Sequence, residues 1–199
     1  MPSERFYNLK PVKRRTFLKM AYKEFALHSY EGASITRLVG DLKMAKGSIY
    51  QYFDDKEDLY NYLIEHAENQ LIELFDKTCP LPQSDDDFYK WIEKAILIQV
   101  KFLLAIPSYA LLFNKHQSDF LGKESEPFIK RKVMEASEIT GEQLSNERLY
   151  LMQNFPLLIF SFITHSEKIK IDSIINSNSS IDIPTDKLLY LCEAFLQKP

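Results

Sequence analysis

The segment Ser34–Leu59 restricts the possible folds most, because it holds two short helical patterns separated by a tight break. The first pattern begins at Ser34, a residue type favoured at helix N-termini. Its apolar residues recur at helical spacing, at Ile35, Leu38, Val39 and Leu42. The second pattern begins at Lys46 and would bury Ile49 and Phe53. Two helices this short cannot bury their apolar faces alone, so we expect them to cross each other on a third helix.

The second pattern leaves a polar face that is unsuited to a protein core. This face carries Lys46, Ser48, Gln51 and Tyr52. A helix-turn-helix has the same layout, and it places its second helix in the major groove of DNA with the N-terminal residues nearest the base edges. Gly47 and Ser48 are small and would let the backbone approach a duplex closely.

The segment therefore predicts two kinds of DNA contact. For base edges the candidates are Gln51, Lys46 and Ser48, with Thr36 or Arg37 also in the groove. For phosphates the candidates are Tyr50, Tyr52, Lys56 and Ser34. Gln51 is suited to adenine because its amide group can pair with that base through two hydrogen bonds.

Several residues between about positions 10 and 63 carry a resemblance to a known family. They are Phe25-Ala26, Ser34-Ile35, Leu38, the run Lys46–Phe53, and Lys56–Leu59. In these residues the chain resembles the DNA-binding domain of the tetracycline-repressor (TetR) family of transcriptional regulators. The resemblance implies a homodimer that binds a palindromic DNA operator and is released by a small effector. Repression relieved by a ligand is the commonest behaviour in this family.

Three positions depart from the family pattern. Many members have Gly where Ser29 and Lys43 stand, and Ser or Thr where Ala45 stands. In the turn, we expect Lys43 to take a left-handed conformation that Gly would adopt more easily. Ala45 removes a usual cap, which leaves the start of the recognition helix less firmly held.

Charge is divided unevenly along the chain, although the total is only −3. Residues 1–56 hold 11 Lys and Arg against 6 Asp and Glu, a net charge of +5. The remainder holds 14 against 22, a net charge of −8. A basic end on an acidic body is typical of a protein that places one end on phosphates. Solvated faces of Lys-rich helices would give the same composition, but here the basic excess coincides with the helix-turn-helix.

We expect an all-α protein with two domains. The first, residues 1–55, is the three-helix helix-turn-helix domain, and the second, residues 56–199, is a helical bundle for ligand binding and dimerisation. The helix from Lys56 to about Phe75 has apolar residues at every fourth position. In the family this helix transmits ligand binding to the DNA-binding domain, and the resemblance implies the same role here.

The aromatic residues of the acidic body are candidates for an effector pocket, which is itself implied by the resemblance. Such pockets are mostly apolar with a few placed polar groups. The candidate lining residues are Trp91, Phe102, Tyr109, Phe113, His116, Phe120, Phe128 and Phe155. For each single residue a plain core position is the stronger interpretation of an aromatic at helical spacing, and the pocket as a whole rests on the resemblance.

The last two expected helices, from Asn146 to about Ile169 and from Thr185 to Gln197, carry more apolar residues than a small body needs. Pairing across a two-fold axis would bury them, as the corresponding helices do in the TetR family. The candidate dimerisation residues are Met152, Ile159, Phe162, Ile163, Leu188, Cys192 and Phe195. The same apolar residues could instead close the bundle within one chain.

Other classes of protein find less support in the sequence. No metal-ligand spacing, Gly-rich phosphate loop or nucleophile elbow occurs, so we expect no enzyme, no cofactor and no metal. The two Cys residues lie far apart, and neither a signal peptide nor a membrane span is indicated, which predicts a soluble cytoplasmic protein. The alternative to a ligand-responsive repressor is a helical small-molecule carrier or interaction module that has kept a DNA-binding fold without using it.

Overall fold

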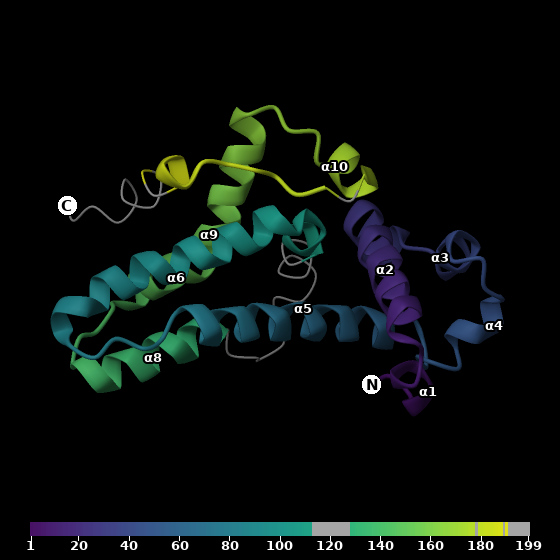
Figure 1. Ribbon diagram of the computed structural model, residues 1–199, viewed down its shortest axis with the longest axis horizontal. Coiled ribbons are helices and arrows are strands. Elements are labelled where there is room, and N and C mark those ends of the chain that lie inside the picture. The colour runs from purple at the N-terminus through teal and green to yellow at the C-terminus, as the bar shows by residue number, and fades with distance from the viewer. Residues whose placement is uncertain (113–127, 178, 189, 191–199) are drawn as a thin grey trace. The chain divides into compact units, whose positions relative to one another are not determined.

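The computed structural model describes residues 1–112, 128–177, 179–188 and 190, and its regular elements within these residues are all helices (Figure 1). The elements are α1 Glu4–Tyr7, α2 Pro11–Gly32, α3 Ile35–Asp41, α4 Lys46–Ile49, α5 Lys56–Thr78, α6 Asp85–Ala105, α8 Phe128–Thr140, α9 Asn146–Ser166 and α10 Ile171–Ser177. Residues 107–112 are also helical. The predicted all-α class is confirmed.

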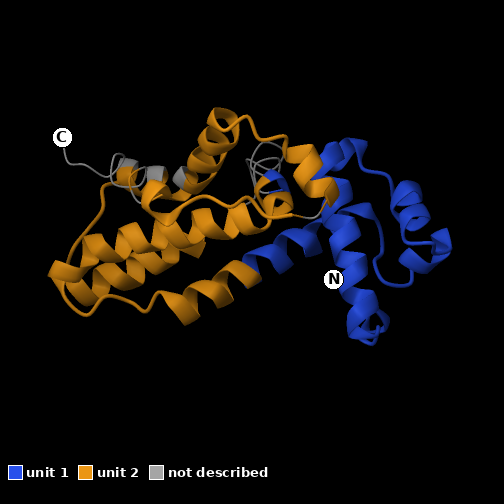
Figure 2. Cartoon of the chain, turned by 45° about the horizontal axis from the view of Figure 1, so that its top comes forward, with its two compact units in different colours: residues 1–69, 111–121 blue, residues 70–110, 122–199 orange. Residues whose placement is uncertain are grey.

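The chain divides into two compact units, drawn in two colours in Figure 2. The first comprises Met1–Asn69 and Leu111–Leu121, and the second comprises Gln70–Ala110 and Gly122–Pro199. Helix α5 therefore contributes its first part to one unit and its last part to the other. The functional boundary between residues 55 and 56 stays a prediction.

In the first unit, α2 is the helix on which the two short helices rest. It begins at Pro11, whose missing amide hydrogen costs nothing at a helix start. Phe17 and Phe25 are among its buried residues. Near its end Ser29 departs from helical geometry, with φ 59° and ψ 175°. The expected third helix of the domain is therefore present, and it continues to Gly32 across this kink.

Helix α1 has no counterpart among the expected elements. It is only four residues long, and Phe6 is its single buried residue. The amide of Leu9 donates to the Phe6 carbonyl at 3.2 Å, which turns the chain toward α2. A four-residue helix has too few residues to show a periodic pattern in the sequence.

Helix α5 begins where two aspartates supply hydrogen bonds to its first turn. The Asp55 carboxylate accepts from the Asp58 amide at 2.8 Å, and the Asp58 carboxylate accepts from the Asp54 amide at 3.1 Å. The two bonds satisfy one amide of the first turn and one amide just before the helix, neither of which has a helical partner. The apolar positions predicted for one face are buried at Leu59, Leu63, Ala67 and Phe75.

In the second unit, α6 packs against α9, and α8 packs against both. Helix α6 ends before Pro107, which cannot continue the backbone hydrogen bonding. Helix α8 ends at Thr140, where Gly141 takes a positive φ of 76°. Beyond α10, which was not expected, the Ile181 amide donates to the Leu104 carbonyl at 2.8 Å.

Candidate nucleic-acid interface

The first helix of the helix-turn-helix, α3, is capped as the sequence predicts. Ser34 lies at the N-cap in an extended conformation, and its Oγ accepts from the Arg37 amide at 3.3 Å. This bond satisfies one of the amides that every helix leaves without an internal partner. The buried residues of α3 are Leu38 and Val39, which face the core of the first unit.

The turn between α3 and α4 has the backbone that its residues predict. Lys43 takes a φ of 51°, which confirms the expected left-handed conformation. The Met44 amide donates to the Val39 carbonyl at 2.9 Å and closes the turn. Helix α4 then starts after Ala45, which makes no side-chain cap bond, again as expected. The recognition helix therefore begins without the support that Ser34 gives to α3.

Helix α4 and the turn that follows it separate an inner face from an outer one. Ile49 and Phe53 are each 2% exposed and form the inner face, which confirms that prediction. The outer face is formed by exposed residues, which are Lys46, Gly47, Tyr50 and Gln51. Ser48 and Tyr52 are half-buried at its margin. A short cationic and polar surface of this kind matches what a major groove requires.

Gly47 is not required by the packing within the chain. A Cβ atom built at this position meets no other atom within 4 Å, and its φ is not in the left-handed region. The space next to Gly47 is therefore open on the outer face of α4. A glycine there allows close approach of the backbone to another molecule, which is the role that the sequence predicts for it.

Arg37, predicted to lie in the groove, makes its hydrogen bonds within the first unit. Its Nε lies 3.0 and 2.9 Å from the two carboxylate oxygens of Glu24, and its Nη2 donates to the Gly32 carbonyl at 3.0 Å. The Ser34 amide donates to the same carboxylate at 2.7 Å. Arg37 therefore ties α3 to α2, whereas its exposed neighbour Thr36 keeps the predicted outward position.

Glu24 is the residue of this site that the sequence does not reveal. It is 5% exposed, which is rare for a carboxylate unless it is paired. Burial opposes its ionisation, but the hydrogen bonds from Arg37 and from the Ser34 amide outweigh burial, so the pKa of Glu24 lies below its usual value. The carboxylate is thus charged at neutral pH and holds the start of α3 in place.

Lys56, predicted to contact a phosphate, lies over the end of α2. Its Nζ donates to the Tyr30 carbonyl at 2.8 Å and lies 3.4 and 3.5 Å from the carbonyls of Glu31 and Ala33. The same Nζ lies 4.5 Å from the centre of the Tyr30 ring. A cation in this position stabilises the negative end of a helix, and the attraction to the ring adds to it. The structure therefore assigns Lys56 a role inside the first unit.

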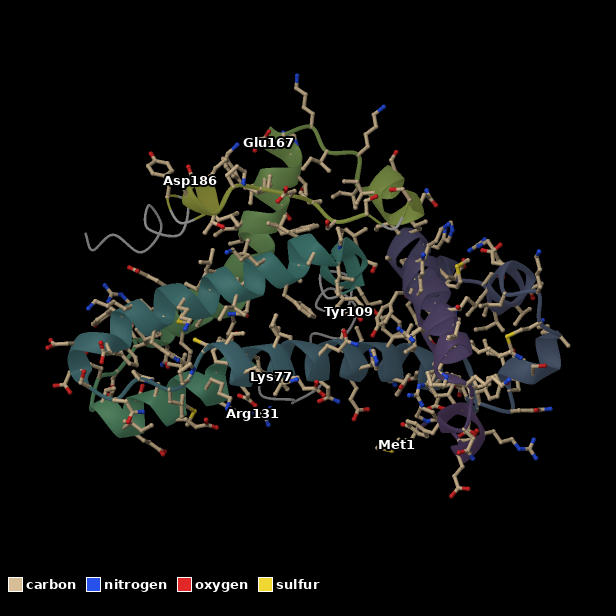
Figure 3. The ribbon with its side chains drawn as sticks, in the orientation of Figure 1. Met1, Lys77, Tyr109, Arg131, Glu167 and Asp186 are labelled. Carbon is tan, nitrogen blue, oxygen red and sulfur yellow. The ribbon has the colours of Figure 1, made fainter. Side chains whose placement is uncertain are left out.

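The predicted pocket residues fall into two groups within the second unit. Trp91 is 5% exposed and Phe128 is half-buried, and the ring centres of both lie near Phe75, at 6.0 and 5.1 Å. Phe102 and Tyr109 are buried and lie 5.4 Å apart. The Tyr109 hydroxyl, labelled in Figure 3, also donates to Gln70 Oε1 at 3.1 Å. Phe113, His116, Phe120 and the side chain of Phe155 lie outside the described residues.

The predicted dimerisation residues are mostly buried within the single chain. Exposures of 1–3% are found for Met152, Ile159, Ile163 and Leu188. These four therefore belong to the core of the second unit and have almost no surface left for a second copy. Phe162 is 59% exposed, and Leu158, one turn earlier on α9, is 51% exposed. Cys192 and Phe195 lie outside the described residues.

Among the residues that the structure describes, no helix is long and apolar enough to cross a membrane.

The capped α3, the left-handed turn and the exposed outer face of α4 together define a helix-turn-helix protein. Residues 17–63 match the family described as "Bacterial regulatory proteins, tetR family". Over these residues the chain has the DNA-binding domain of that family.

Two curated relatives extend the similarity beyond this domain. The chain is 30% identical to the HTH-type transcriptional repressor AcnR of Corynebacterium diphtheriae over 115 residues, which cover 53% of this chain and 58% of that protein. It is 31% identical to AcnR of Corynebacterium efficiens over 119 residues, which cover 55% of this chain and 61% of that protein. The chain thus matches less than two thirds of the length of these repressors.

The fold is similar over nearly the whole chain to a solved structure. The crystal structure of a TetR family transcriptional regulator from Chloroflexus aurantiacus matches with a TM-score of 0.73 and 21% sequence identity. The match covers 98% of this chain and 94% of that one. At 21% identity, this similarity shows the fold alone.

Proposed function

We propose that the chain is a transcriptional repressor that binds a palindromic DNA operator as a homodimer and is released by a small hydrophobic effector. The observation that carries this proposal is the outer face of α4. There Lys46, Gly47, Tyr50 and Gln51 are exposed while the inner face is buried. The curated relatives named as transcriptional repressors, and the basic charge of residues 1–56, support the same function.

DNA recognition is proposed to use Lys46, Ser48 and Gln51 for base edges, with Thr36 beside them. Tyr50, Tyr52 and Ser34 are proposed to contact phosphates. Arg37 and Lys56 are left out of this set, because Glu24 and the carbonyls of α2 hold their charged groups. Their positive charges still add to the attraction that draws DNA to this end of the chain.

A homodimer is proposed because α9 presents neighbouring apolar side chains to solvent. Leu158 and Phe162 lie four residues apart and therefore adjoin on the helix surface. A two-fold dimer would place two copies of α4 about 34–36 Å apart, which is one turn of DNA. An effector is proposed to bind among the aromatic residues of the second unit, next to Trp91, Phe102, Tyr109 or Phe128. A cytoplasmic location remains a prediction.

Selection of bound fragments from random duplex DNA tests the proposal. The purified chain should enrich an inverted repeat whose half-sites lie about 10 base pairs apart, and sedimentation should give the mass of two chains. Binding should weaken steeply between 50 and 200 mM salt, because each neutralised phosphate adds about 0.9 to the salt slope. A carrier with an unused DNA-binding fold would instead enrich no sequence, and a single-chain mass would contradict the homodimer.

A further inference from the structure

The turn that follows the recognition helix is held by Ser3, which lies near the other end of the unit in sequence. Ser3 Oγ donates to the Gln51 carbonyl at 2.6 Å, and the Ser3 amide donates to the Tyr52 carbonyl at 2.8 Å. Both carbonyls lie in the turn beyond α4, where no helical hydrogen bond is available to them, so they need partners elsewhere. One residue thus satisfies two successive carbonyls, and both belong to residues on the proposed DNA-binding face.

Phe6 packs behind the same turn. Its ring is fully buried, with its centre 5.0 Å from Phe53 and 6.0 Å from Tyr52. It also lies 5.4 Å from Phe17 of α2 and 5.4 Å from Tyr62 of α5. The ring therefore fills the space between the turn and the two long helices, and these four ring contacts lie within the first unit.

The short helix α1 is itself fixed to α2. Arg14 Nη1 donates to the Tyr7 carbonyl at 2.9 Å, which satisfies the end of α1. Residues 3–7, which begin just after the Met1 labelled in Figure 3, are thus bonded at one end to the turn and at the other to α2. We call residues 3–7 the strut.

Such a strut matters because α4 is poorly supported by its own sequence. It has four residues and begins at Ala45 without a side-chain cap. Helices of this length are not stable in isolation, so their geometry depends on neighbouring groups. Contacts that a protein makes with DNA are strongest when the contacting side chains are already in place before binding.

We propose that Ser3 and Phe6 are positioning residues for DNA recognition, which hold the turn Tyr50–Phe53 so that Gln51 and Tyr52 face the duplex. Neither residue contacts DNA itself. The inference rests on the proposed function, because it assumes that the outer face of α4 binds DNA. It assigns a role to a segment that lies outside the matched residues 17–63.

The test compares Ser3→Ala with the conservative Ser3→Thr and with the control Thr16→Ala. Thr16 donates its hydroxyl to the Val12 carbonyl within α2, so the control loses a hydroxyl bond that does not reach the turn. The probe is the inverted-repeat duplex recovered by selection. Three quantities are measured on the full chain: affinity for this duplex, thermal midpoint, and amide hydrogen exchange of residues 50–53.

Ser3→Ala should weaken binding by about threefold to tenfold, as expected for one lost hydrogen bond. Exchange of residues 50–53 should become faster, and the thermal midpoint should fall by only a few degrees, so that the chain stays folded at the temperature of the binding assay. Ser3→Thr should restore affinity, and Thr16→Ala should leave both affinity and exchange unchanged. The salt slope should be the same in all variants, because the number of phosphate contacts does not change. Phe6→Leu, which keeps an apolar side chain, should weaken binding at least as much.

Wild-type affinity in Ser3→Ala would overturn the inference, and so would a loss of affinity without faster exchange of residues 50–53. A wild-type chain that prefers no DNA sequence would instead refute the proposed function. In that case unchanged exchange of residues 50–53 in Ser3→Ala would also refute the strut.

Discussion

At the start of α3, side chains supply several hydrogen bonds, whereas at the start of α4 no side-chain cap is made. Ser34 Oγ accepts from the amide of Arg37, and Glu24 accepts from the amide of Ser34 and from the guanidinium. Ala45 offers no such group. The supporting helix is therefore fixed at its beginning, and the recognition helix is fixed at its end, through Ser3 and the buried ring of Phe6.

This difference indicates how one small unit serves both stability and recognition. The charged groups of Glu24, Arg37 and Lys56 are used inside the unit, where they join α2 to its neighbours. The start of α4, with its open space at Gly47, is left to meet another molecule. Removal of a bond at α3 should thus mainly change stability, and changes at α4 should mainly change local order and DNA binding.

The largest expected effect is that of Glu24→Gln at the start of α3. The substitution keeps the shape of the side chain but removes the charge that Arg37 pairs with. It should lower the free energy of unfolding by about 1–3 kcal/mol, with the lower part of this range favoured because Arg37 is 43% exposed. Urea denaturation measures the loss. The control Glu31→Gln, at an exposed position of α2, should change stability by less than about 0.5 kcal/mol; equal losses in the two variants would contradict the assignment.

The same pair predicts a dependence on pH. Because the pKa of Glu24 is lower in the folded chain than its usual value near 4.5, the pair contributes fully above that value. The contribution is lost as the pH falls through the lower folded-state pKa. The difference in stability between the wild type and Glu24→Gln should be constant from pH 7 to about pH 6 and shrink below about pH 4.5. A difference that stays constant down to pH 3, measured by urea denaturation, would argue against the pair.

The next effect is a gain in stability from Ser29→Gly. Ser29 has φ 59° and ψ 175°, a backbone region that is essentially restricted to glycine. Relief of this strain, less the entropy lost by glycine, should raise the free energy of unfolding by about 1 kcal/mol. Lys43→Gly should gain less, because φ 51° in a tight turn is a milder departure. As a control, Lys19→Gly within regular α2 should lower the free energy of unfolding by about 1 kcal/mol. If thermal unfolding showed that Ser29→Gly also lowers stability, the backbone at Ser29 would not be strained.

The smallest effect is that of Ala45→Ser, which gives α4 the cap that α3 has. The new hydroxyl should accept a backbone amide of the first turn and add about 0.5–1 kcal/mol. Exchange of the Gly47 amide, at the second position of the helix, should slow. The matched change Ser34→Ala should cost α3 a similar amount. If Ala45→Ser lowered stability, the start of α4 would already be satisfied by another group, and the contrast between the two helices would be broken.

Local sequence patterns were sufficient to predict much of this unit. Ser34 as a cap, Lys43 in a left-handed turn, and Ile49 and Phe53 as inner contacts were all expected, and the structure confirms each of them. Each depends on residues within one or two helical turns of one another, so spacing and residue type alone determine the outcome.

Partners distant in sequence were not predictable in the same way. An amphipathic pattern places Glu24 on a helix, but it does not tell which carboxylate is buried against a guanidinium 13 residues later. Lys56 was predicted to contact a phosphate. Its carbonyl partners on α2 lie 23 to 26 residues earlier, so no local pattern could show them. The apolar periodicity of α9 identified Ile159 and Ile163 as residues that must be covered. It did not tell whether their own chain or a second copy covers them.

The central claim is that the outer face of α4 reads DNA sequence, and Gln51 is its most direct probe. The measurement is the affinity of the wild type and of Gln51→Ala for the selected duplex and for duplexes altered at single base pairs, at one physiological salt concentration. Gln51→Ala should lose about 1–3 kcal/mol of binding free energy and show a relaxed preference at one base pair in each half-site. Equal affinity of both proteins for every duplex would contradict the central claim.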